Sequence, residues 1–272
     1  MFIHIFNNKS MDDILHKGLI LCHFDTSDDV FGLNREILDS EITKYNDVAF
    51  DYGSKYSERI QIKFALVKKD KSSFTVNEIR RITKWLMTEN NQKLKLISDS
   101  HGINDGYFYF GKSNSVIKKR VNREVGLVCT FVNDSAYLYK ENKVSIGKTT
   151  TIYVDSDVDI IYPTIHIKTK SNTVVELFNK STNEKISFNA TPLGAKIDCE
   201  NLTVTDLSGK TIVDENNHPI FLSKLFNSDQ LFLSLKNGRN EIKVLCQAID
   251  TEIFFKYTEK LYGGILDEFG QG

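Results

Sequence analysis

The segment FTVNEIRRITKWLMTENNQKLKLI, Phe74 to Ile97, contains the only long helix signal in a sequence that otherwise has the pattern of short strands. Thr75 is a favourable N-cap residue, and Glu78 stands three positions later, which is the spacing of a capping box. A 3.6-residue period places one apolar set on a single side of a helix: Val76, Ile79, Ile82, Trp85 and Leu86. The basic residues fall largely on the other side: Arg80, Arg81 and Lys84. The segment therefore predicts an amphipathic helix near 76–88 whose apolar stripe packs on a sheet.

Around this segment, apolar residues alternate with polar ones, as in half-buried strands. The clearest case is Arg59–Val67, in which the apolar positions recur with a period of two. Near the start, Ser10 followed by Asp13 predicts a short capped helix that ends before Gly18. Further strands are expected at Gly18–Asp25, Ile37–Ile42, Val48–Asp51, 94–96, Tyr107–Gly111, Ser115–Arg120, Gly126–Val132 and Ala136–Tyr139. One helix packed on antiparallel strands predicts an α+β first domain over residues 1–146.

The second half of the sequence has strand signals and no helix signal. The runs with strand length and composition are TTTIYVD, TIHIKTK, TVVELFNK, KISFNA, AKIDC, NLTVTD, LFLSLK, NEIKVLCQ and EIFFKYTEK. Short strands separated by turn residues every 8–12 residues or so indicate an all-β sandwich, here over residues 147–272. The fold class expected for the whole chain is therefore mainly β. The sequence leaves open whether the last strand, 252–258, belongs to the sandwich or returns to the first domain.

Charge and composition limit the class of protein. The 272 residues carry a formal net charge of -1 with acids and bases intermixed, which gives no broad electrostatic basis for binding nucleic acid or an acidic membrane. The cysteines lie far apart in apolar contexts and are expected to be reduced and buried: Cys22, Cys129, Cys199 and Cys246. No signal peptide or membrane-spanning stretch is visible, so we expect a protein made in a cytoplasm.

Asp155, Asp157 and Asp159 form a D-x-D-x-D triplet, which is how a calcium-binding loop begins. Such a loop needs Gly at the next position and Glu at the twelfth, where this sequence has Ile160 and His166. We therefore interpret the aspartates as solvent-facing residues near a strand and not as a metal site.

No arrangement of residues typical of catalysis is found. The histidines show no metal-type spacing: His4, His16, His23, His101, His166 and His218. His166 lies in an alternating run and is expected to face outward as a polar residue. The sequence has no nucleophile elbow and no glycine-rich phosphate loop, and neighbouring carboxylates such as Asp12 and Asp13 are poorly placed for acid–base work. We predict no catalytic residue, no cofactor and no metal, and we leave the oligomer interface unassigned.

A basic cluster lies close to a run of aromatic residues. The cluster is Lys112, Lys118, Lys119, Arg120 and Arg123, and the run is YFYF at 107–110. Such a combination can stack single-stranded nucleic acid. The alternative is a hairpin that buries its aromatic rings and solvates its lysines, and the neutral overall charge favours this alternative.

Several stretches together resemble one protein family. In the first half these are GLILCHFD (18–25), YGSKYSERIQIKFALVKKD (52–70), FTVNEIRRITKWL ahead of KLKLI, and GLVCTFVNDSAYLY (126–139), which lacks the proline often found in its last part. In the second half they are SDVDIIYPTIHIK (156–168) and LFNSDQLFLSLKNGRNEIKVL (225–245), with an L-x-x-G-x-N hairpin. This pattern is similar to the distal tail proteins of long-tailed phages of Gram-positive bacteria. Their N-terminal tail domain is followed by a galectin-like sandwich.

The resemblance implies a structural protein of the virion tail and not an enzyme. It implies a homo-oligomer, a hexameric ring hub that joins the tail tube protein to the baseplate, with its tail-tip or receptor-binding proteins. The loop-rich segment Thr26–Tyr56 is then a candidate arm that reaches a neighbouring subunit. Lectin activity is not implied, because the sandwich in this family generally departs from sugar-binding galectins.

Two other functions remain open at this stage. The sandwich is alternatively a carbohydrate-binding module for host cell-wall sugars, which a glycan array would detect. An enzyme is the third hypothesis, and the lack of a nucleophile or ligand set argues against it. The sequence does not distinguish a phage from a tail-like bacteriocin.

Overall fold

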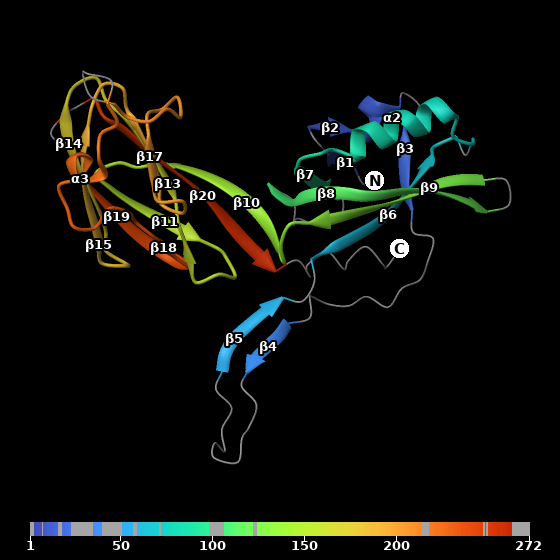
Figure 1. Ribbon diagram of the computed structural model, residues 1–272, viewed down its shortest axis with the longest axis horizontal. Helices are drawn as coiled ribbons and strands as arrows, with labels where there is room; N and C mark the ends of the chain where they lie inside the picture. The colour runs from blue at the N-terminus through green and yellow to red at the C-terminus, as the bar shows by residue number, and fades with distance from the viewer. Residues whose placement is uncertain are drawn as a thin grey trace, which may run out of the picture. The chain divides into compact units, whose positions relative to one another are not determined.

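The computed structural model describes residues 3–6, 8–15, 18–22, 35–39, 51–56, 59–70, 72–97, 106–121, 124–213, 218–246, 248 and 250–262. They form two compact units, whose elements are labelled in Figure 1. The first unit contains the described residues up to Tyr139 together with Tyr262, and the second is Lys140–Leu261. The mainly β fold class is confirmed, and the strands pair antiparallel wherever the structure describes their register.

The first unit is an antiparallel sheet with helices on it. Its strands pair in the order β2-β1-β7-β8-β9-β6-β3. Its elements are β1 (Ile3–Phe6), β2 (Lys9–Ser10), α1 (Met11–Ile14), β3 (Leu19–Cys22), β4 (Arg35–Asp39), β5 (Asp51–Tyr56), β6 (Gln61–Lys68), α2 (Val76–Leu86), β7 (Gln92–Ile97), β8 (Tyr107–Val121), β9 (Glu124–Asn133) and the first residues of β10 (Tyr137–Ser145). The predicted α+β arrangement is confirmed.

Local sequence signals place the two helices of the first unit correctly, miss the short helix Leu222–Leu225 of the second unit, and split one strand wrongly. Thr75 caps α2 and shares a capping box with Glu78, and Ser10 and Asp13 do the same for α1. The two strands predicted at 107–111 and 115–120 are a single strand, β8, with a shift in register between Ser113 and Ser115. A β-bulge of this kind interrupts the alternation without ending the strand, which explains the error.

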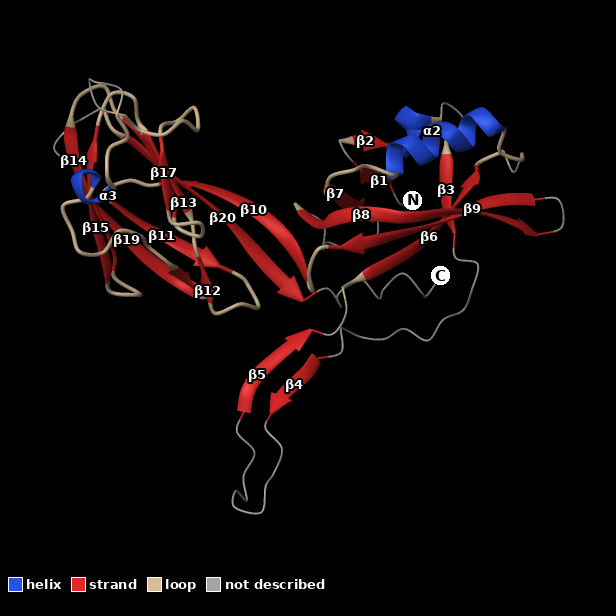
Figure 2. Ribbon diagram, viewed as in Figure 1, coloured by secondary structure: helices blue, strands red, loops and turns tan. Residues whose placement is uncertain are grey.

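Helix α2 packs on one face of the sheet (Figure 2) through its C-terminal half. Ile82, Trp85 and Leu86 are buried. The Trp85 indole N–H donates a hydrogen bond to the backbone oxygen of Phe6 (2.9 Å), and the two rings meet edge to face at 6.1 Å. Phe6 also meets Phe131 of β9 edge to face at 6.0 Å. Phe6 thereby connects the helix to the middle of the sheet.

The N-terminus of α2 is fixed by a buried lysine. Lys68, at the end of β6, is only 4% exposed. Its ammonium group contacts Glu78 at 2.6 Å, donates to the backbone oxygen of Ser73 at 3.0 Å, and lies over the Phe74 ring. The hydrogen bond from Lys68 and those from the Thr75 cap lower the pKa of Glu78 below its ordinary value. The capping box and the ion pair therefore share one carboxylate.

The second unit is a β-sandwich. One sheet has the order β17-β16-β13-β20-β10 and the other β11-β19-β14-β15, with a short β12-β18 pair. Its further elements are β11 (Thr149–Val154), β12 (Ile160–Ile161), β13 (Thr164–Lys168), β14 (Thr173–Asn179), β15 (Glu184–Ala190), β16 (Ala195–Asp198), β17 (Thr203–Thr205), α3 (Leu222–Leu225), β18 (Leu235–Lys236), β19 (Gly238–Cys246) and β20 (Glu252–Tyr262). Alternate residues of both sheets meet in one core, which includes Ile165, Leu177, Phe188, Ile242 and Phe255.

The last strand, which the sequence leaves unplaced, is the long strand β20. It pairs with β13 in the sandwich, from Glu252 opposite Lys168 to Lys256 opposite Thr164. The last residue of β20, Tyr262, lies within the first unit, where its ring packs on Tyr137. Strand β10 likewise runs from the first unit into the second.

The L-x-x-G-x-N hairpin is held by its asparagine. Gly238 has φ of +86°, a conformation that suits glycine at the turn. Asn240 is completely buried, accepts from the Lys236 N–H at 3.0 Å and donates to the Lys236 oxygen at 2.8 Å. It also accepts from the amide of Asn179, another fully buried side chain. The side-chain amide of Asn240, and not water, therefore supplies the hydrogen bonds that the Lys236 backbone makes in this turn.

Glu78→Gln is expected to destabilise the protein by about 1–3 kcal/mol, because it keeps the capping geometry but leaves Lys68 without its counter-charge. A carboxylate whose pKa is lower in the folded state than in the unfolded chain stabilises the fold at pH values above its unfolded pKa. That contribution is lost as the pH falls through its folded pKa. The difference between the variant and the wild type should hence shrink well below pH 4. Urea unfolding at pH 7 and pH 3 measures it.

Glu252→Gln is the control, since its ion pair with Lys168 is exposed and 3.4 Å long. It should change the unfolding free energy by less than about 0.5 kcal/mol. The role given to the buried pair would be contradicted if both variants lost the same free energy of unfolding. It would also be contradicted if the loss in Glu78→Gln did not depend on pH.

Asn240→Ala is expected to destabilise the sandwich by about 2–4 kcal/mol, because the buried Asn179 amide and the backbone of Lys236 each lose a hydrogen-bond partner. Asn201→Ala removes an amide that donates to Asp198 in an exposed turn and should cost less than about 1 kcal/mol. Thermal unfolding of the two variants beside the wild type compares them, and similar midpoints would show that the hairpin does not need its amide.

Candidate functional site

The aspartate triplet faces solvent, as predicted. Asp155, Asp157 and Asp159 are all exposed. The backbone around them is tied to β20, since the Asp155 N–H donates to Glu259 at 3.1 Å and the Asp157 N–H to the Lys260 oxygen at 2.8 Å. Within the described ranges, no three His, Cys, Asp or Glu side chains gather as metal ligands.

Two of the cysteines lie in the interior as small apolar residues. Cys129 and Cys199 are free and buried, and burial raises the pKa of each thiol to about 12. A thiol with such a pKa supplies almost no thiolate at neutral pH, so neither is an activated nucleophile. Cys246 is half-buried. The side chain of Cys22 lies outside the described residues.

His166 lies on the outer face of the sandwich, as predicted, but it is half-buried there. Its ring stacks on Phe254 at 4.4 Å with an interplanar angle of 13°. Burial, followed by the charges of Lys256, Lys196 and Lys143, lowers the pKa of His166 to about 4. His218 is exposed, whereas the side chains of His4, His16, His23 and His101 lie outside the described residues.

The middle of the aromatic run 107–110 belongs to the core of the first unit, and Tyr107 and Phe110 at its ends are half-buried. Phe108 and Tyr109 are buried, while Lys112 and Lys118 are exposed. The hairpin interpretation is thus confirmed for these four residues. The side chains of Lys119, Arg120 and Arg123 lie outside the described residues. Because Phe108 and Tyr109 are packed inside, these two rings are not available for stacking on nucleic-acid bases.

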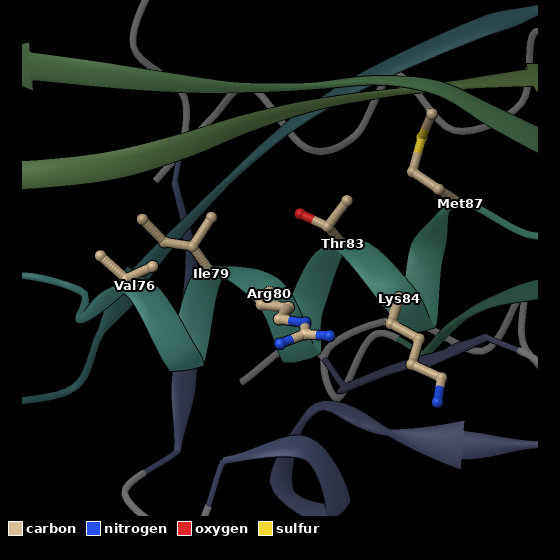
Figure 3. A pocket seen from close by; sticks show the side chains of 6 residues that line it. All are labelled: Val76, Ile79, Arg80, Thr83, Lys84 and Met87. Carbon is tan, nitrogen blue, oxygen red and sulfur yellow. The ribbon is translucent and has the colours of Figure 1, made fainter.

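The outer side of α2 carries an apolar groove that the sequence analysis missed. Figure 3 shows its lining residues: Val76, Ile79, Arg80, Thr83, Lys84 and Met87. Val76 is 81% exposed and does not join the buried stripe, contrary to the prediction. At about 100° per residue it lies roughly a third of a turn from the centre of the buried set. The groove therefore presents apolar side chains beside two cations, as a protein-contact surface does.

Strands β4 and β5 form a separate hairpin. They pair only with each other among the strands that the structure describes, with a register irregularity between Ile37 and Asp39. The sequence placed these strands at 37–42 and 48–51, within a few residues of their positions. A lone two-stranded hairpin is marginally stable in water, and both of its outer edges can accept another strand. Such a hairpin is suited to pairing with, or packing on, another surface.

Among the described surfaces, the groove on α2 and the β4-β5 hairpin are the ones suited to binding and assembly. No helix in the described part of the chain is long and apolar enough to cross a membrane.

Comparison with known proteins gives two findings. Residues 3–135 match the family model described as phage tail protein N-terminal domain. Over 96% of this chain and 99% of the other, the fold is similar to the crystal structure of the SPP1 Dit (gp 19.1) protein, with a TM-score of 0.60. That protein is described as a paradigm of the hub adsorption apparatus in phages that infect Gram-positive bacteria. The two sequences are 11% identical, so this likeness shows the fold. No curated protein sequence matches the chain.

The expected resemblance to phage tail proteins of this type is confirmed. The family match covers the first domain, and the structural likeness extends to the sandwich. Both findings support a structural role in a phage tail.

Proposed function

We propose that this phage tail protein forms a hexameric ring hub that joins the tail tube to the baseplate or host-recognition device. The observation that carries the proposal is the likeness in fold to SPP1 Dit over nearly the full length of both chains. The proposed partners are copies of the chain itself, the tail tube protein, and tail-tip or receptor-binding proteins. We place the assembled protein in the virion tail, of a phage or a phage-like particle, after synthesis in the host cytoplasm.

The physical features of the chain fit this role. A ring is a closed set of heterologous contacts, so each subunit needs two different complementary faces and no active site. The β4-β5 hairpin provides unpaired strand edges, and the groove on α2 provides an apolar contact surface. The buried thiols and the exposed aspartates give no support to an enzymatic role.

The assembly state of the purified protein tests the proposal. Light scattering after size exclusion should give a mass near six subunits, and negative-stain images at high concentration should show six-fold rings with an open lumen. If the isolated chain is monomeric, the same measurements are repeated with the tail-tip protein present. Monomers under both conditions, or rings of another symmetry, would count against the hexameric hub.

We further propose that the segment Thr26–Tyr56, which contains the β4-β5 hairpin, is the arm that contacts the neighbouring subunit. Deleting residues 27–46 removes β4 and most of this segment but none of the residues that the structure describes as buried. The deletion should leave a folded monomer that no longer assembles, as followed by circular dichroism and light scattering. Assembly unchanged by the deletion would refute the arm.

A second variant separates the arm's sequence from its length. Replacing residues 27–46 with a glycine–serine linker of equal length should also abolish assembly, because such a linker pairs poorly as a strand. Replacing Leu207–Lys210, an exposed turn of the second unit, with glycine and serine serves as the control and should leave assembly intact.

A further inference from the structure

The apolar part of the groove on α2 is exposed in the part of the chain that the structure describes. Val76 and Met87, at the two ends of the groove, are 81% and 43% exposed, and Ile79 between them is half-buried. Figure 3 shows these side chains, together with Thr83, along one side of the helix. Large apolar side chains grouped at a surface favour contact with another apolar segment.

The cations beside the groove have no counter-charge among the described residues. Arg80 and Lys84 line the groove, Arg81 is their neighbour on the helix, and all three are exposed. None of the three forms an ion pair or a hydrogen bond with a residue that the structure describes. An acidic group brought to the groove would therefore be attracted by charges that no described carboxylate already neutralises.

The described carboxylates around the helix are engaged or lie beyond the groove. Glu78, the only carboxylate of α2, is held by its capping box and by its ion pair with Lys68. Helix α1 contacts α2, and its exposed Asp13 is held by the Ser10 cap. Glu89 is exposed and lies past the end of the helix. The described residues that line the groove are thus apolar, neutral or cationic.

The segment that follows Tyr262 has the composition that matches this groove. Residues 263–272 lie outside the described residues, and their sequence is GGILDEFGQG. The segment has two acids and no base, and its large apolar and acidic residues form one run: Ile265, Leu266, Asp267, Glu268 and Phe269. Glycines on both sides of this run leave the backbone free to take the conformation that the groove requires.

Tyr262 lies near the C-terminal end of the groove. Its ring packs on Tyr137 at 5.4 Å, and the Tyr137 backbone oxygen accepts a hydrogen bond from the Asn133 side chain at 2.7 Å. Asn133 lies opposite Gly111 of β8, which lies opposite Gln92 of β7, five positions after the last residue of the groove. These two strand spacings amount to about 10 Å. Ten residues can extend over about 33 Å, so the segment is long enough to reach the groove.

We propose that residues 265–269 dock in the groove on α2 of their own chain, with Asp267 and Glu268 against Arg80 and Lys84. The three apolar side chains of the segment then cover those of the groove. A contact within one chain needs little intrinsic affinity, because a short linker holds the segment at an effective concentration near millimolar. The proposal does not rest on the ring. In the proposed ring, a neighbouring surface that uses the groove has to displace the segment.

The methionine methyl groups test the proposal in the full chain. The chain contains Met1, Met11 and Met87; Met87 lines the groove, whereas Met11 is buried. With ¹³C-methyl methionine, deleting residues 263–272 should shift the Met87 NMR signal and leave the Met11 signal in place. Adding the synthetic peptide GGILDEFGQG to the truncated chain should return the Met87 signal toward its full-length position. Dilution of the full chain at a constant assembly state, checked by light scattering, should not move it.

Charge reversal tests the ion pairs. Arg80→Glu with Lys84→Glu in the truncated chain should weaken peptide binding by about tenfold, because two attractive pairs become repulsive. A peptide carrying Asp267→Lys with Glu268→Lys should bind this variant more tightly than the unchanged peptide does. If the reversed variant does not fold, Arg80→Gln with Lys84→Gln should weaken binding by about threefold, since the attraction is lost without repulsion.

The control is Lys112→Glu with Lys118→Glu, two exposed lysines of β8 in the same unit, and it should bind the peptide as the unchanged truncated chain does. An equal loss in this control would overturn the proposal, as would a Met87 signal that is the same with and without residues 263–272. A full-length Met87 signal that moves on dilution would overturn the assignment to the same chain and give the segment to the groove of a second copy.

Discussion

The packing of Phe6 between Trp85 and Phe131 is the contact on which the first unit depends. A sheet with one apolar face is stable only when that face is covered, and α2 provides the cover. The indole hydrogen bond to the Phe6 backbone oxygen fixes where the C-terminal half of α2 lies, and the Lys68–Glu78 pair fixes its N-terminus. Two anchors of different chemistry, about two turns apart on one helix, define both its position and its direction.

That anchoring leaves the outer side of α2 available for contact with another protein surface. Only the C-terminal half of α2 has its apolar residues fully buried, so Val76, Ile79 and Met87 are left to line the outer groove. The β4-β5 hairpin is likewise stabilised by no other described strand. Exposed apolar side chains and open strand edges are surfaces that contact with another chain would cover, which is what the proposed ring requires.

The sandwich relies on a different principle, in which polar groups are satisfied inside an apolar core. Asn179 and Asn240 are fully buried and hydrogen-bonded to each other and to the hairpin backbone.

The sequence by itself determined the local features whose signal lies within a few residues. These are the two capping boxes, the strand periodicity of both halves, the burial of Phe108 and Tyr109, and the resemblance to phage tail proteins. Tertiary structure decided what depends on contacts between distant residues. It joined 107–111 and 115–120 into one bulged strand, turned Val76 to solvent, and brought Lys143, Lys196 and Lys256 to one face around His166 and Phe254. Periodicity shows which residues share a face, but the residues opposite one another on neighbouring strands are set by sheet order and register, which arise only when the chain folds.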